Sequence, residues 1–252
     1  MGREHHRRFF VPPEAIREGH AELDRVQAHQ LARVLRLGEG DPVSILDGTG
    51  REWTAILTHA TARRAGARLL AELPRVPPPR PRITLAQVVP RGAAMDLIVA
   101  KATELGVACI QPLEASHSVR RGSERGPRWR RIVIEATEQC GRRDLPVLAD
   151  ACTLESLLQR HPPARSLLAC HGGADHSPLP VVCQELRGVT EITLLVGGEG
   201  GLAHEELVRV EGHGGRLVSL GPRLLRAETA ALAAVSVLQA CLGGWATRSD
   251  CM

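Results

Sequence analysis

The chain has few aromatic side chains and almost no lysine. Phenylalanine, tryptophan and tyrosine together make up 2 % of its 252 residues, tyrosine is absent, and Lys101 is the one lysine. Proteins that bind single-stranded RNA by base stacking present an aromatic platform, so this mode of recognition is disfavoured here. A nucleic acid would be bound through arginine instead, because the planar guanidinium suits phosphate contacts. The use of arginine in place of lysine is equally consistent with a genome-wide compositional bias.

Membrane, secretory and disulfide signatures are missing as well. The chain contains no uninterrupted apolar run of the roughly 18 residues that a transmembrane helix requires. Its N-terminus, Met-Gly-Arg-Glu-His-His-Arg-Arg, lacks the apolar segment of a secretory signal. The seven cysteines are odd in number and are never spaced as C-x-x-C, which argues against a disulfide framework or a zinc knuckle. We expect a cytoplasmic protein with reduced cysteines.

Motifs of several enzyme classes are also absent. There is no G-x-x-x-x-G-K-[ST] phosphate loop and no G-x-S-x-G nucleophile turn, and the eleven histidines show no H-E-x-x-H spacing. We therefore expect no metal. Residues 198–203 formally match the dinucleotide fingerprint G-x-G-x-x-A, but Leu217–Gly221 stands where that fingerprint requires an acid about 20 residues later.

Two glycine loops dominate the last third of the chain. The apolar run 192–196 is followed by Gly-Gly-Glu-Gly-Gly at 197–201, and the run 217–220 is followed by Gly221. Glycines after a buried strand let the backbone approach a ligand, and ligands of open α/β sheets bind beyond the carboxyl ends of the strands. One such loop alone is most simply a tight turn. The pair predicts a single site, with Glu199 and Arg226 as its charged side chains.

The chain divides at a proline-rich segment. Five prolines fall between Pro74 and Pro81, and such a stiff segment is typical of a linker. We predict domains at 1–73 and 83–252, joined by the linker 74–82. The first has a helix at 26–37 and strands at 42–46, 52–57 and 67–73, with an Asp-Gly turn at 47–50. This pattern predicts a small antiparallel β-barrel or sandwich.

The second domain alternates strands and helices, which predicts a parallel α/β sheet with helices on both faces. The expected strands are 83–89, 107–113, 166–170, 192–196 and 217–220. The expected helices are 93–105, ended by Gly106, 127–140, ended by Gly141, and 154–160, 179–186 and 230–242.

Four blocks carry a resemblance to a known family. They are Met95–Val107, Arg128–Arg142, the loop 195–202 and the segment 220–231. In order and over nearly the whole chain, they resemble the bacterial 16S ribosomal RNA (uracil-N3)-methyltransferase family of the SPOUT superfamily. The N-terminal Arg8–Val11 and His29–Leu37 resemble the PUA-like RNA-binding domain of that family.

The resemblance implies an α/β fold: a C-terminal SPOUT methyltransferase domain with a trefoil knot and a parallel sheet, and an N-terminal PUA-like β-barrel domain. It also implies a homodimer that binds S-adenosylmethionine in the knot loops. The cofactor-binding residues implied in this way are Leu168, His171, Gly172, Val196, Gly197, Gly198, Gly200, Gly201, Leu220, Gly221, Leu225 and Thr229. The family usually has proline where Gly198 stands, so this loop is less preorganised by about 0.5 to 1 kcal/mol.

Methylation of a uracil N3 requires orientation, a proton acceptor and stabilisation of charge on the pyrimidine oxygens. We assign Arg226 to stabilising the uracil anion or to positioning a phosphate, and Glu199 or Glu228 to orientation or to the proton. An alternative role for Glu228 is to stabilise the N-terminus of the last helix. The 16S RNA of the small ribosomal subunit would be bound by arginines of both domains, namely Arg7, Arg8, Arg33, Arg36, Arg120, Arg121, Arg125 and Arg128.

Two other functions remain open from the sequence. The same fold is compatible with methylation of a ribose 2′-hydroxyl or of another base, because loop glycines do not report the acceptor atom. A non-catalytic RNA-binding assembly factor is the other alternative, supported by Gly198.

Overall fold

The protein folds into two compact units. The computed structural model describes residues 7–114, 125–162, 166–172, 176–243 and 245. One unit is built from the described residues of 1–78 together with 137–145, and the other from those of 79–136 and 146–252. Within these described parts, no helix has both the length and the apolar character needed to cross a bilayer. The domain limits at 1–73, 74–82 and 83–252 stay a prediction.

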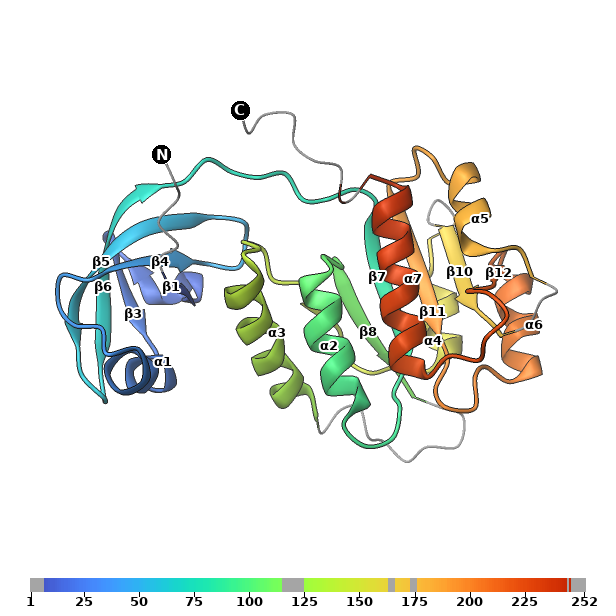
Figure 1. Cartoon of the computed structure of the whole chain (residues 1–252), viewed down its shortest axis with the longest axis horizontal. Coiled ribbons are helices and arrows are strands. Elements are labelled where there is room, and N and C mark those ends of the chain that lie inside the picture. Colours follow the sequence, from blue (N-terminus) through green and yellow to red (C-terminus); the bar gives the residue numbers. More distant parts are fainter. Residues whose placement is uncertain (1–6, 115–124, 163–165, 173–175, 244, 246–252) are drawn as a thin grey trace. The chain divides into compact units, whose positions relative to one another are not determined.

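The first unit contains a curled, six-stranded sheet of order β1-β4-β5-β6-β3-β2 (Figure 1). Its strands are β1 (Arg7–Phe10), β2 (Ile16–Arg17), β3 (His20–Leu23), β4 (Pro42–Leu46), β5 (Glu52–Ala60) and β6 (Ala65–Glu72). Four of the neighbouring pairs are antiparallel, as predicted, but β1 runs parallel to β4. The sheet is therefore mixed. Parallel neighbours need a long crossover connection, because a short hairpin can join only antiparallel strands, and the chain between β1 and β4 is long enough to provide it.

One helical segment covers the inside of this curled sheet. The helix predicted at 26–37 consists of α1 (Arg25–His29) continued by the π-helix η2 (Gln30–Leu35), and a short 3-10 turn, η1 (Pro13–Ala15), precedes them. Asp24 and Gln27 form a reciprocal capping box that starts α1. Arg36 ends the segment in the left-handed region, at φ 56°, where glycine is the usual residue.

The core of the first unit lies between this segment and the sheet. Alternate residues of the strands face it, which is the period of two expected for a sheet with one buried side. The buried members are Phe9, Val11, Ala21, Leu23, Ala28, Leu31, Val43, Ile45, Ala55, Leu57, Ala65 and Ala67.

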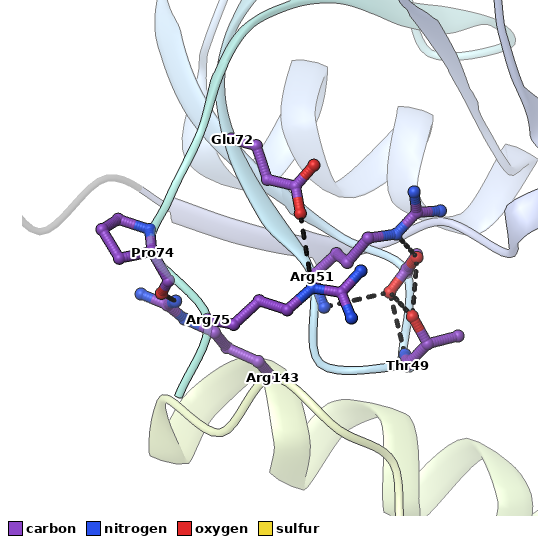
Figure 2. Close-up of polar contacts among 7 residues, drawn as sticks. Thr49, Arg51, Glu72, Pro74, Arg75 and Arg143 are labelled. Carbon is purple, nitrogen blue, oxygen red and sulfur yellow. Dashed lines mark hydrogen bonds and ion pairs between the residues drawn. The ribbon is translucent and has the colours of Figure 1, made fainter. Parts of the chain in front are cut away.

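The turn between β4 and β5 is organised by one buried carboxylate (Figure 2). Asp47 is 2 % exposed, and it accepts hydrogen bonds from the Thr49 N–H at 2.8 Å, the Thr49 hydroxyl at 2.8 Å and Arg51 Nε at 2.8 Å. Burial raises the pKa of Asp47, but these hydrogen bonds and the Arg51 charge outweigh it and leave the pKa below 3.8. The turn is therefore held by an ionised side chain.

Residues 137–145 complete the first unit through polar contacts. Glu52, which is 5 % exposed, pairs with Arg8 Nε at 2.9 Å and with Arg143 Nε at 2.6 Å. Glu138 Oε1 accepts from the Phe10 N–H at 2.8 Å, and Arg143 also donates to the Pro74 carbonyl (Figure 2). This segment of chain, distant in sequence, provides the acceptor for the Phe10 N–H and a second partner for Glu52, which Arg8 of β1 already contacts.

The second unit contains a six-stranded sheet in which every neighbouring pair is parallel, as predicted. Its order is β12-β10-β11-β7-β8-β9. The strands are β7 (Arg82–Val88), β8 (Cys109–Leu113), β9 (Val147–Leu148), β10 (Ser166–Cys170), β11 (Glu191–Val196) and β12 (Arg216–Val218). The prediction of a strand at 217–220 placed its end two residues too late, and β9 was not predicted.

Helices cover both faces of this sheet, as predicted. They are α2 (Ala94–Glu104), α4 (Leu154–Arg160), α5 (Leu179–Glu185), α6 (His204–Gly212) and α7 (Ala227–Cys241). A further helix, α3 (Gly126–Cys140), begins in the second unit and ends in the first. Helices α2 and α7 lie side by side over the sheet (Figure 1), and α5 packs against α7. On the other face, α4 and α6 bury leucine and valine side chains against Ala86, Leu167, Ala169 and Leu195. Gly106 and Gly141 follow α2 and α3 at positive φ, as expected of helix C-termini.

We predict that Asp47→Asn lowers the free energy of unfolding by about 1–3 kcal/mol at neutral pH, because the network loses its negative charge and one of its two acceptor oxygens. The folded-state pKa of Asp47 lies below its unfolded value. The ionised carboxylate therefore stabilises the fold above about pH 4, and this contribution is lost as the pH falls through the folded pKa. Urea denaturation of the wild type and of Asp47→Asn, repeated from neutral to acidic pH, measures this. The difference between their free energies of unfolding should shrink as the pH falls. Asp150→Asn, at an exposed carboxylate, is the control. If the difference between the wild type and Asp47→Asn stays the same in acid, the ionised Asp47 carboxylate is not what stabilises the turn.

Candidate functional site

A cavity of the second unit lies at the carboxyl ends of three neighbouring strands, β12, β10 and β11. The loops that follow these strands line it, together with the first turn of α7. The lining residues are Cys170, His171, Gly172, Val196, Gly197, Gly198, Glu199, Gly201, Leu220, Gly221, Arg223, Leu224, Leu225, Ala227 and Ala230. Both glycine loops singled out from the sequence thus border the same cavity, in the position where open α/β sheets bind ligands.

The first glycine loop folds back on itself so closely that its first residue has to be glycine. A Cβ atom at Gly197 would lie 2.5 Å from the carbonyl carbon of Gly201. The Gly201 N–H donates to the Gly198 carbonyl at 3.1 Å, which closes the turn. Gly198 itself is less constrained, because its Cβ would come no nearer than 3.4 Å to a side-chain carbon of Val88.

The second glycine loop turns at Gly221. This residue has φ +105°, which side-chain-bearing residues rarely adopt, and no atom lies within 4 Å of where its Cβ would be. Its N–H donates to Ser219 Oγ at 3.1 Å. The backbone therefore borders the cavity without a side chain that would fill it.

Of the three predicted catalytic residues, Glu199 lines the cavity. Its Oε1 accepts a hydrogen bond from the Arg91 N–H at 2.6 Å, which joins the glycine loop to the segment after β7. Arg226 is the exposed N-cap residue of α7, and Glu228 is half-buried in the first turn of that helix. Neither is among the described lining residues, although both lie within two residues of the lining residue Ala227.

One lining residue carries a thiol. Burial raises the pKa of Cys170 to about 12, so the side chain is a neutral thiol at physiological pH. Cys170 therefore forms an uncharged part of the cavity surface and is not an activated nucleophile.

Most of the predicted cofactor-binding residues border the cavity, and three do not. Leu168 is buried within β10, and Gly200 and Thr229 are exposed outside the described lining. The sequence analysis did not name Cys170, Arg223, Leu224, Ala227 or Ala230 as contacts. All of these lie within two residues of predicted positions, so the positions of the predicted loops could have identified them.

Seven of the eight predicted RNA-binding arginines fall into three groups. Arg7, Arg33 and Arg36 are exposed in the first unit. Arg125 donates to the Gly92 carbonyl at 2.8 Å, and Arg128, with 68 % of its side chain exposed, pairs with Asp96 at 2.6 Å. Arg120 and Arg121 lie outside the described residues.

Arg8 does not fit the predicted role. Its side chain is 14 % exposed and its Nε is paired with Glu52, while Nη2 donates to the Arg142 carbonyl at 3.0 Å. Because this guanidinium is engaged inside the first unit, we withdraw Arg8 from the RNA-binding set.

Comparison with known proteins agrees with this architecture. Residues 77–239 match the family described as an RNA methyltransferase domain, and residues 23–70 match the RNA methyltransferase PUA domain. The ribosomal RNA small subunit methyltransferase E of Synechocystis is 35 % identical over 240 residues, which cover 93 % of this chain and 78 % of the relative. The chain belongs to this methyltransferase family. The fold class expected from the sequence is thereby confirmed.

Solved structures of family members were determined with a ligand. The methyltransferase E of Neisseria gonorrhoeae, bound to S-adenosylmethionine, has a TM-score of 0.85 and 31 % identity, covering 94 % of this chain and 98 % of its own. A Legionella pneumophila protein described as a methyltransferase, solved in complex with S-adenosylmethionine, has a TM-score of 0.83 and 31 % identity, with coverages of 93 % and 97 %.

The geometry of the first glycine loop leads to a matched pair of variants. We predict that Gly197→Ala lowers the free energy of unfolding by about 1–3 kcal/mol, since the added methyl overpacks against backbone. Gly198→Ala should change stability far less, because its methyl makes an ordinary contact. Urea denaturation of both variants measures this, and equal losses at the two positions would refute the described loop conformation.

Proposed function

We propose that this protein transfers a methyl group from S-adenosylmethionine to the N3 atom of a uracil in 16S ribosomal RNA. The observation that carries the proposal is the cavity at the ends of β12, β10 and β11, bordered by two glycine loops, in a member of a ribosomal RNA methyltransferase family. Relatives of nearly the same length bind S-adenosylmethionine. The acceptor atom rests on the family resemblance of the sequence.

The residues that border the cavity fit this cofactor. Backbone without side chains at Gly197 and Gly221 leaves room for a ligand and exposes polar N–H and C=O groups to it. Leu225, Ala227 and Ala230 provide apolar surface for an adenine ring. When bound, the cofactor supplies an electrophilic methyl group on a sulfonium. The loops 170–172, 196–201 and 220–225 would hold it.

The protein must also accept the N3 proton and stabilise charge on the uracil oxygens. We assign the proton to Glu199 Oε2, because Oε1 is already occupied by the Arg91 N–H and the carboxylate borders the cavity. Arg226, exposed at the start of α7, is assigned to the developing negative charge. Glu228 lies in the first turn of α7, where a carboxylate also stabilises the helix N-terminus.

The decisive experiment is methyl transfer from radiolabelled S-adenosylmethionine to small ribosomal subunits that lack the modification, followed by nucleoside analysis. We expect 3-methyluridine. A 2′-O-methylated nucleoside or another methylated base would show that the protein is a methyltransferase but that uracil N3 is not its acceptor atom. Cofactor binding without transfer to any subunit preparation would favour a non-catalytic RNA-binding factor.

In the same assay, Arg226→Ala should reduce the transfer rate by about 10²-fold, the usual effect of removing one group that stabilises transition-state charge. Binding of S-adenosylhomocysteine should remain, since Arg226 does not belong to the described cavity lining. Arg187→Ala, exposed after α5, is the control. Transfer by Arg226→Ala at the wild-type rate would remove this residue from the mechanism.

We propose 16S ribosomal RNA as the partner, bound by Arg7, Arg33, Arg36, Arg125 and Arg128, with Arg120 and Arg121 as further candidates. Exposed arginine in the first unit supports this, as does the match of residues 23–70 to a PUA domain. A cytoplasmic homodimer remains part of the proposal. Its structural support is Leu224, a cavity-lining side chain that is 94 % exposed in the single chain.

Phosphate contacts make RNA binding dependent on salt, because each neutralised phosphate releases counterions. Replacing both Arg33 and Arg36 by alanine should weaken binding and lower the slope of log Kd against log salt by about 2. Arg63→Ala with Arg64→Ala, exposed between β5 and β6, is the matched control in the same unit. Equal slopes for the two double variants would argue against the assigned surface.

A further inference from the structure

A buried glutamine lies beside the first glycine loop. Gln87 is the penultimate residue of β7 and stands in register with Val196, the last residue of β11. It is 0 % exposed, and its neighbours along β7, Leu85, Ala86 and Val88, are all apolar and buried. A polar side chain at such a position requires an explanation from its contacts, because an apolar one would be buried at lower cost.

The amide of Gln87 is directed at backbone carbonyls of the two strand ends. Its Nε2 donates to the Gly197 carbonyl at 3.0 Å and to the Val88 carbonyl at 2.9 Å, and the Val196 carbonyl lies at 3.4 Å. Three acceptors around one atom determine which end of the amide is the nitrogen. The other end, Oε1, is buried with no partner among the described atoms. The side chain thus leaves its own acceptor unsatisfied while it binds the loop.

Gly197 is the residue whose position sets the shape of the loop, since its backbone packs directly on Gly201. Glycine has no side chain through which the core can hold it. The described contacts that hold the loop to the segment of β7 are the Gln87 amide at Gly197 and the Arg91 N–H at Glu199. Gln87 acts from inside the core, and Arg91 from the exposed side.

We propose that Gln87 is a positioning residue for the cofactor site, which holds the Gly197 carbonyl so that the loop 197–201 keeps its ligand-binding conformation before the ligand arrives. This inference rests on the proposed function, because it takes the cavity as the S-adenosylmethionine site. Gln87 is not among the described residues that line the cavity, so its effect on the ligand passes through the backbone of Gly197. Preorganisation of this kind raises affinity by reducing the ordering cost of binding.

The neighbouring strand contains a natural control. Gln111 of β8 is 7 % exposed, and its Nε2 donates to the carbonyl of the next residue, Pro112, at 3.0 Å and to the Asp150 carbonyl at 2.7 Å. The chemistry matches that of Gln87, but neither acceptor belongs to the cavity lining. A purely structural role predicts the same consequences for the loss of either amide.

The test compares Gln87→Met with Gln111→Met, which keep the side-chain length and remove the amide. S-adenosylhomocysteine is titrated calorimetrically into each full-length protein, and hydrogen exchange of the 197–201 amides is measured without ligand. For Gln87→Met we expect a Kd at least tenfold higher and faster exchange in the loop, and a higher KM for S-adenosylmethionine with kcat largely retained. Gln111→Met should keep the wild-type Kd and the wild-type exchange in this loop.

Equal changes in both variants, or an unchanged Kd for Gln87→Met, would overturn the proposal. If Gln87→Met does not fold, Gln87→Asn replaces it, since the shorter stem withdraws the amide from Gly197 and should raise Kd in the same direction. A wild-type protein that does not bind S-adenosylhomocysteine would refute the proposed function. Hydrogen exchange of the 197–201 amides, measured without ligand, would then still show whether Gln87 holds Gly197.

Discussion

The candidate site depends on the close approach of two pieces of backbone, Gly197 and Gly201. No side chain fits between them, since a Cβ at Gly197 would lie 2.5 Å from Gly201. The turn lies at the end of a strand that is flanked by β10 and β7, so any displacement of it changes the wall of the cavity directly. The rigid parallel sheet and the loop therefore function together: the sheet fixes where the loop starts, and the glycines allow it to return.

Much of the second unit could be predicted from sequence because its signals are local. Short β-branched and leucine-rich runs identified β10 and β11, and glycines at helix ends located the ends of α2 and α3. The two glycine loops were recognised as a pair for the same reason. The strand order and the contacts of Gln87 depend on pairing between distant segments, which composition and periodicity do not report. The knot was implied by the family resemblance alone.

The errors concern residues whose partners are far away in the chain. Arg8 was assigned to RNA together with the other arginines of the first domain, but its partner Glu52 lies on a strand 44 residues later. The parallel pairing of β1 with β4 has the same origin, as antiparallel hairpins are the only pairings that turn signals predict. The role of Arg226 stays a prediction, because the structure places this residue at the exposed start of α7, next to the lining residue Ala227. Local sequence identified elements well, and specific side-chain environments less well.

The return of residues 137–145 to the first unit has a consequence for the order of folding. Glu52 and the Phe10 N–H receive partners from Arg143 and Glu138, and these are synthesised only after β7, α2 and β8. During translation the small sheet therefore emerges long before the groups that complete it. The first unit reaches its final stability only after residues 137–145 have been synthesised. Its assembly therefore has to wait until β7, α2 and β8 of the second unit have been made.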